Sequence, residues 1–292
     1  MKYSFITQHK NTYPVYLMCE VLGVIRQCYY HYRRNKENKP ADPEHLEMLM
    51  WVKDIAEASD DTYGSRRMKE ALNALGFPVS RNKARKLMKE AKVQVRHRKR
   101  YKVTTNSNHK QPVFDNLVKR QFDVLEPDQV YVADITYIWT QEGWLYLAVV
   151  IDLFSRKMVG WSMGSRMTAR LVCDALTMAI WQRKPKAGLI HHSDRGSQYA
   201  SKAFRTLLKV HGISGSMSAK GDCWDNAVAE SFFGSLKQER VHWRNYQTRY
   251  EAQQDILNYI SMFYNSIRLH STLDYLSPNN YEKQLTEMKK AA

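Results

Sequence analysis

The stretch QVYVADITYIWTQEGWLYLAVVIDLFS, residues 129–155, decides the fold of this chain. It holds two runs rich in β-branched and aromatic residues, and the short turn sequence QEG at 141–143 separates them. That arrangement predicts a β-hairpin. The run KMVGWSMGSR at 157–166 has the same composition and predicts a third strand. We therefore expect a meander of three strands.

Beyond the meander, helical and strand patterns alternate. Residues 168–183 place apolar side chains at helical spacing, and residues 188–196 form a short apolar run that ends in a polar turn. A helix over 201–212, a short strand over 213–218 and a helix from about Asp225 follow. Five strands with intervening helices predict an α/β fold with a mixed sheet.

Three carboxylates occupy informative places in this pattern. Asp134 lies within the apolar first strand, where an acid buried alone costs several kcal/mol unless a cation or donor faces it. Asp194 lies where the fourth strand ends, the edge at which open α/β sheets place their sites. Glu230 lies in the last of these helices, with 35 residues between it and Asp194. Oxygen ligands suit hard divalent cations, and a pair of such ions can catalyse in-line phosphoryl transfer.

The chain is strongly basic and the charge is uneven. Among 292 residues, Lys and Arg number 45 against 29 Asp and Glu, and the net charge is +16. Residues 81–110 alone contain 12 basic residues and one acid. An excess of this kind favours a nucleic-acid partner over a merely solvated basic face, because it coincides with a helix-turn-helix pattern.

That pattern begins with a helix from about Ser65 to Leu75, which Gly76 ends. Ser80 then predicts the N-cap of a second, basic helix. Candidate DNA contacts are the basic residues of this second helix and of the linker after it: Arg81, Lys83, Arg85, Lys86, Lys89, Arg98, Lys99 and Arg100.

Pattern and charge together predict the domain organisation. We expect a helical DNA-binding region over 1–93, a basic linker over 94–124, a catalytic core with C-terminal helices over 125–282, and a tail over 283–292. Within the first region, a helix over 46–58 is expected to bury one apolar face, consisting of Leu46, Leu49, Met50, Val52 and Ile55.

Compartment is predicted from what the sequence lacks. No apolar run approaches the roughly 20 residues of a membrane span, and the N-terminus has no secretory pattern. The four cysteines show no zinc-ligand spacing and predict reduced thiols. We expect a cytoplasmic protein that works on DNA and not at a membrane.

Residues 129–282 resemble the DDE-type integrase core that retroviral integrases share with bacterial insertion-sequence transposases. The resemblance rests on ADITY around Asp134, HHSDRGSQY around Asp194, and DNAVAESFFGSLKQE around Glu230. The tail YNSIRLHSTLDYLSP at 264–278 matches as well. The front half also resembles the second-reading-frame transposases of insertion sequences. The matching stretches there are LGVIRQCYYHYRR and YGSRRMKEAL.

This resemblance implies an RNase H-like fold in which Asp134, Asp194 and Glu230 are catalytic and ligate Mg²⁺. Two ions are expected, with Mn²⁺ as a substitute. The implied activity is cleavage of a mobile element's 3′ ends and their transfer into target DNA. Partners would be the terminal inverted repeats, target DNA, further copies of the chain and the product of an upstream reading frame. Retroviral integrases open with a zinc-binding domain whose spacing is missing here, so no zinc site is expected.

Further residues have two interpretations each. Lys237, two helical turns after Glu230, is a candidate DNA contact or a solvated lysine. Asn226 either contacts DNA or starts the helix. His191 and His192 are expected to pack or hydrogen-bond rather than bind Mg²⁺, which favours oxygen.

Residues Asn265, Arg268 and His270 of the tail either contact DNA or hold the tail beneath the core, and Glu239 has no predicted role. Two rival functions remain: a DNA-binding regulator that occupies element ends without cutting, and an RNase H-like nuclease.

Overall fold

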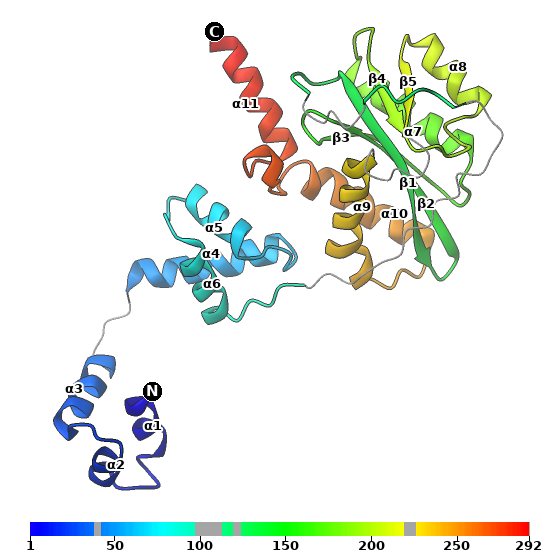
Figure 1. Cartoon of the computed structure of the whole chain (residues 1–292). Helices are drawn as coiled ribbons and strands as arrows, with labels where there is room; N and C mark the ends of the chain where they lie inside the picture. Colours follow the sequence, from blue (N-terminus) through cyan, green and yellow to red (C-terminus); the bar gives the residue numbers. More distant parts are fainter. Residues whose placement is uncertain (38–41, 97–112, 119–123, 219–225, 292) are drawn as a thin grey trace. The chain divides into compact units, whose positions relative to one another are not determined.

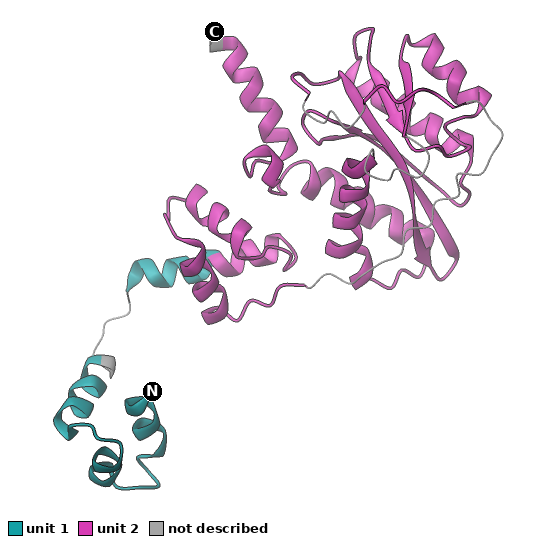
Figure 2. Ribbon diagram, viewed as in Figure 1, with its two compact units in different colours: residues 1–51 teal, residues 52–292 magenta. Residues whose placement is uncertain are grey.

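A computed structural model of the chain describes residues 1–37, 42–96, 113–118, 124–218 and 226–291. These residues form two compact units, Met1–Trp51 and Val52–Ala292 (Figure 2). The domain boundaries predicted after residues 93 and 124 lie inside the second unit and stay a prediction. In the part of the chain that is described, no helix combines the length and the apolar character that crossing a membrane requires.

The first unit is helical. It contains α1 (Lys2–His9), α2 (Val15–Val21), α3 (Arg26–Glu37) and the beginning of α4 (Pro43–Ala58). Its core consists of Ile6, Met18, Cys19 and Tyr29.

The buried face of α4 differs from the predicted one. Leu46 and Met50 are 49% and 64% exposed, while Met48, Val52 and Ala56 are buried. Val52 belongs to the predicted face, and Leu49 and Ile55 of that face are partly buried. The prediction is therefore confirmed at Val52 and wrong at Leu46 and Met50.

A helix-turn-helix follows α4 at the predicted place (Figure 1). Its helices are α5 (Ser65–Ala74) and α6 (Arg81–Glu90). Gly76 has φ +88°, the left-handed conformation that ends helices and suits glycine. The Ser80 hydroxyl accepts a hydrogen bond from the Lys83 N–H at 3.2 Å, which confirms it as the N-cap. Ala84, Leu87 and Met88 pack inward and leave the basic side chains of α6 outside.

The second unit is built on a mixed five-stranded sheet of order β3-β2-β1-β4-β5. The strands are β1 (Val130–Thr140), β2 (Gly143–Asp152), β3 (Met158–Gly164), β4 (Ile190–Ser193) and β5 (Ser214–Met217). β1, β2 and β3 form the antiparallel meander, and β4 and β5 join it in parallel. The predicted fold class is confirmed.

Helices cover both faces of the sheet (Figure 1). On one face, α7 (Ala169–Arg183) and α8 (Lys202–Val210) pack on side chains such as Tyr131 and Ala133. On the other, α9 (Ala227–Glu239), α10 (Arg249–Asn258) and the π-helical turn η3 (Tyr259–Tyr264) pack on Val132 and Ile138. The alternation of side chains along β1 thus supplies both cores. The short helices η2 (Val241–Trp243) and η4 (Ser271–Leu273) and the helix α11 (Pro278–Ala291) complete the described chain.

One edge of β1 is open where the site lies. β4 pairs with β1 only from Val130 to Ala133. From Asp134 onward, no described strand pairs with β1 on this side. The backbone of β1 is therefore free of strand pairing on this side, among the described residues, from the point where β4 ends.

Candidate active site

Asp134 lies at the first position of β1 beyond the β4 pairing. One carboxylate oxygen accepts a hydrogen bond from the Ile135 N–H at 2.7 Å. Burial raises the pKa of Asp134 well above its ordinary value, and the charges of Asp194 and Glu230 raise it further. The ionised form is therefore costly in this protein without a cation.

Asp194 directly follows β4 and begins a tight turn. Its Oδ1 accepts a hydrogen bond from the Gly196 N–H at 2.9 Å. A Cβ atom at residue 196 would lie 2.9 Å from that same oxygen, closer than real Cβ atoms approach. Glycine at 196 thus lets the turn fold back onto the carboxylate and hold it at the sheet edge.

Glu230 and Lys237 come from α9, which packs against β1. Lys237 is the seventh residue after Glu230, about two turns along the helix, so both lie on one side of it. Burial raises the pKa of Glu230. Burial lowers the pKa of Lys237, and the neighbouring Asp134 carboxylate acts in the opposite direction. Three other predicted groups, Asp194, Glu230 and Lys237, thus lie within electrostatic reach of Asp134.

Asn226 is the N-cap residue of α9 and is only 4% exposed. Its Nδ2 donates to the carbonyl oxygen of Ala133, the residue before Asp134, at 3.4 Å. Among the described residues, its buried Oδ1 has no hydrogen-bond partner. Asn226 thus ties the start of α9 to β1 beside the acids, while its contact with DNA stays a prediction.

Tyr199 is a neighbour of the acids that the sequence did not single out. It is buried, and burial together with the charges of Asp134 and Asp194 raises its pKa. Within the described chain, its hydroxyl has no hydrogen-bond partner. Its place in HHSDRGSQY, five residues after Asp194, was the available signal, but an aromatic residue there looks like ordinary core.

The two histidines next to Asp194 have structural roles, as predicted. His191 is buried against the rings of Tyr199 and Phe204. His192 lies in hydrogen-bonding distance of two hydroxyl groups, those of Ser216 at 2.9 Å and Ser218 at 3.3 Å.

The opposite side of α9 carries Glu239, for which a role was missed. Nine residues after Glu230, or two and a half turns, it points away from the acids. Arg268 donates to both of its oxygens at 2.8 and 2.7 Å, and the Tyr259 hydroxyl donates at 2.8 Å. Although burial opposes ionisation, the Arg268 guanidinium lowers the pKa of Glu239. Glu239 is a buried structural anchor.

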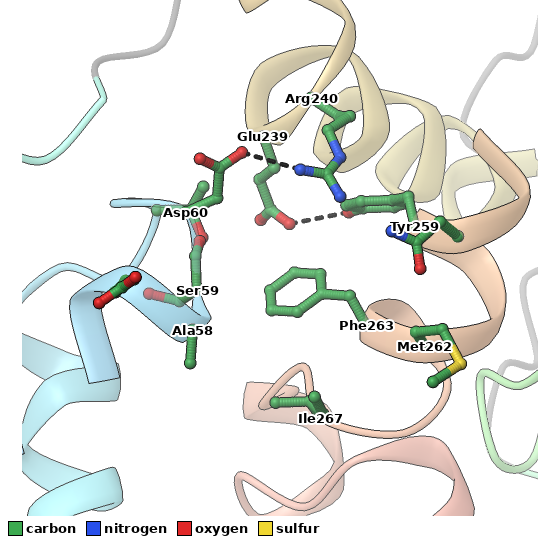
Figure 3. Close-up of a pocket in the computed structure, with 12 residues that line it drawn as sticks. Ala58, Ser59, Asp60, Glu239, Arg240, Tyr259, Met262, Phe263 and Ile267 are labelled. Atoms are coloured by element: carbon green, nitrogen blue, oxygen red, sulfur yellow. Dashed lines mark hydrogen bonds and ion pairs between the residues drawn. The ribbon is translucent and has the colours of Figure 1, made fainter. Parts of the chain in front are cut away.

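The same end of α9 meets the segment that carries the helix-turn-helix. A cavity of about 290 Å³ lies between this segment and α9. Figure 3 shows Ser59 and Asp60 on one side of it and Glu239, Arg240 and Tyr259 on the other. The Arg240 guanidinium donates to Asp60 at 3.0 Å. This cavity lies at the far end of α9 from Glu230 and is lined by ion-paired side chains, so we interpret it as a structural junction.

The tail residues hold the chain in place. The Asn265 side chain accepts from the Met158 N–H at 2.9 Å and donates to the Met158 carbonyl at 3.0 Å, which binds the tail to β3. Arg268 is bound to Glu239, and burial and the nearby Arg268 charge lower the pKa of His270 to about 2. The structural interpretation of these three residues is confirmed.

The predicted DNA-contacting residues of α6 lie on its solvent side. Arg81, Arg85, Lys86 and Lys89 are exposed, and Lys83 is partly buried. Arg98, Lys99 and Arg100 lie outside the described residues. The role of all of them in DNA binding stays a prediction.

Comparisons with known proteins agree with this architecture. Two integrase core domain models match residues 125–223 and 230–285, and an HTH-like domain model matches residues 43–101. Among solved structures, the catalytic core domain of BIV integrase aligns with 18% identity and a TM-score of 0.43, over 56% of this chain and 99% of that one. The fold and the domain matches define a polynucleotidyl transferase with an integrase-type core.

Full-length relatives narrow the assignment. Transposase InsF for insertion sequence IS3A of Escherichia coli (strain K12) is 40% identical over 287 residues, 97% of this chain and 99% of that protein. An uncharacterized 31 kDa protein of insertion element IS600 from Shigella sonnei is 42% identical over 273 residues, 93% of this chain and 99% of that protein. The chain belongs to the IS3 family of insertion-sequence transposases.

Proposed function

We propose that this transposase cuts the 3′ ends of its mobile element and joins them to target DNA at one site formed by Asp134, Asp194 and Glu230. The observation that carries the proposal is that Asp134 on β1, the Asp194 turn at the end of β4 and the Glu230 helix α9 come together at one edge of the sheet. The charges of Asp194, in a turn, and of Glu230, in a helix, both disfavour the ionised form of Asp134 in its strand. Such an arrangement is costly for folding, and a bound cation would relieve the cost.

The donor set fits Mg²⁺, with Mn²⁺ as a substitute. Carboxylate oxygens are the ligands that hard cations prefer. In the described residues, no three His, Cys, Asp or Glu side chains lie close enough together to enclose an ion by themselves. Mg²⁺ keeps several waters and is bound through one or two carboxylates together with substrate phosphates, so the proposal does not require three carboxylates to enclose the ion before DNA binds. When bound, two such ions would stabilise the attacking and leaving oxygens of an in-line displacement.

The protein's own groups would position the DNA. Lys237 presents an ammonium beside Asp134, suited to a phosphate next to the reacting one. Exposed basic residues of α6 would bind the backbone of the element's terminal inverted repeats. Further copies of the chain and the product of an upstream reading frame are proposed partners, with the cytoplasm as the compartment.

The test is to incubate the protein with labelled end DNA and target DNA in Mg²⁺, Mn²⁺, Ca²⁺ or EDTA. We expect cut and joined strands in Mg²⁺ and Mn²⁺, and DNA binding without turnover in Ca²⁺, which tolerates irregular coordination. Hydrolysis without joining would favour a nuclease. Binding without cutting in Mg²⁺ would favour a regulator, and full activity in EDTA would exclude the metal site.

A further inference from the structure

Aromatic side chains gather on the surface of the β1–β2 hairpin, near its turn. Tyr137, Trp139 and Trp144 are 37%, 53% and 42% exposed, and we call these three residues the aromatic patch. Trp139 lies opposite Trp144 in the register, and their rings meet edge to face with centroids 4.9 Å apart. The ring of Tyr137 meets Trp144 in the same way at 5.0 Å. Clustered apolar surface of this kind marks a binding site more often than scattered single residues do.

Stabilisation of the hairpin does not account for the patch. Ile138 and Leu145, which lie between these aromatic residues along the strands, are buried in the core under α9 and α10. Side chains on that face already anchor the hairpin to the second unit. The large rings on the other face therefore leave apolar area in water, which folding alone does not require.

The aromatic patch adjoins the candidate active site through Lys237. The Lys237 ammonium lies 5.0 Å from the centre of the Tyr137 ring, and it also interacts with Asp134. It can reach both because β1 has no β4 partner from Asp134 onward. Tyr137 and Trp139 lie three and five residues beyond Asp134, about 10 and 17 Å along a strand. A DNA strand covers such a distance with a few nucleotides, because it advances about 3.4 Å per nucleotide when stacked as in a duplex and more when extended.

We propose that the aromatic patch stacks unpaired bases of the DNA strand a few nucleotides from the reacting phosphate. Aromatic rings beside a cation are the combination by which proteins hold single strands: the rings stack on bases and the charge faces the backbone. Lys237 supplies the local charge, and the net charge of +16 suits a polyanion. The occupant is an unpaired strand, because duplex bases are already stacked on one another. The inference rests on the proposed function, which places DNA at the three acids.

The test measures DNA binding in EDTA, so that it does not depend on cleavage. The substrates are one end duplex that is fully paired and the same duplex with a short unpaired flank. Trp139→Ala should bind the flanked DNA about tenfold more weakly, the size of effect expected for one stacking ring, with little change for paired DNA. Trp139→Phe should recover most of the loss. Trp181→Ala, which removes a 75% exposed tryptophan of α7, is the matched control and should bind both DNAs normally.

A second measurement uses the unaltered protein with 2-aminopurine in the unpaired flank. Stacking should quench its fluorescence, and unchanged fluorescence would overturn the proposal whether or not Trp139→Ala folds. The proposal would also be overturned if Trp139→Ala bound each of the two DNAs as tightly as Trp181→Ala does. So would a Trp139→Ala protein with normal DNA binding and an altered sedimentation coefficient, since the patch would then join two copies of the chain. If Glu230 proved dispensable for cleavage while these binding results held, the active-site proposal would fail and the patch would remain a strand-binding surface.

Discussion

Asp134 lowers the stability of the folded protein in the same ionised form that the proposed function requires. Burial and the charges of Asp194 and Glu230 raise its pKa, so that its ionised form destabilises the folded protein. Groups that lower the stability of the fold and have no evident structural role are typical of functional sites. A cation would reverse the balance, and since metal binding displaces protons, apparent metal affinity should increase with pH.

Asp134→Asn should stabilise the metal-free protein and lower its activity by a factor of about a hundred or more. The amide keeps the acceptor for the Ile135 N–H and removes the charge. The folded-state pKa lies above the unfolded value of about 3.9, so the stability gain should be present at neutral pH and vanish as the pH falls below about 4. Thermal unfolding in EDTA across this pH range measures it. Asp174→Asn, at an exposed aspartate, is the control, and a lower melting temperature for Asp134→Asn at pH 7 would contradict the prediction.

At the scale of the element, the two sides of α9 have different roles. Glu230 and Lys237 face the candidate site, and Glu239 binds Arg268 on the other side. The Arg240 side chain adds an ion pair to Asp60, which connects the end of α9 to the segment before the helix-turn-helix. Arg96 donates to Asp60 and to the carbonyl oxygen of Glu239. These contacts of Glu239 and Arg240 form a polar junction that holds the end of α9, the helix that carries Glu230.

Arg268→Met should lower the free energy of unfolding by about 3–5 kcal/mol, because it leaves the buried Glu239 carboxylate with only Arg67, at 3.5 Å, as a charge partner. Arg170→Met breaks a pair between side chains that are 88% and 55% exposed, and it should cost less than about 1 kcal/mol. Urea unfolding of both variants measures the difference. Equal effects would show that the junction contributes no more than a surface pair.

The outer face of α6 is expected to lie on the DNA backbone. Replacing Arg85, Lys86 and Lys89 together by Ala should weaken binding to all DNA sequences alike. If each side chain contacts one phosphate, the slope of log K against log salt should fall by about 2.7, at about 0.9 per contact. Filter binding over a range of salt concentrations gives the slope. An unchanged slope would remove α6 from the backbone.

The helices and strands could largely be predicted from the sequence, because hydrophobic periodicity and the residues that begin or end an element are local features. The hairpin, the third strand, the Ser80 cap and the Gly76 stop depend on residues within a few positions of one another. The Glu239–Arg268 pair could not be predicted, since 29 residues separate its members and no periodic pattern connects them. Likewise, the position of Tyr199 beside the acids depends on how the β4 turn packs, which only the folded chain shows.

At the scale of the whole molecule, the chain combines two kinds of surface that a transposase needs. The second unit carries a basic helix on a helix-turn-helix and an integrase-type core whose three acids come from separate elements. The first unit has a small core of its own and adds three further helices. Backbone binding by α6 and chemistry should therefore be separable by substitution, because α6 carries none of the three acids.

The most direct test of the central claim is Glu230→Gln, compared with Glu287→Gln, which alters a 66% exposed glutamate of α11. The glutamine keeps the shape and helix propensity of residue 230 and removes the charge that a hard cation requires. Cleavage and joining of labelled end DNA in Mg²⁺ should both slow by a hundredfold or more in Glu230→Gln, while gel-shift binding to the same DNA stays normal. Glu287→Gln should cut, join and bind like the unaltered protein. Cutting at the unaltered rate by Glu230→Gln would contradict the proposed active site.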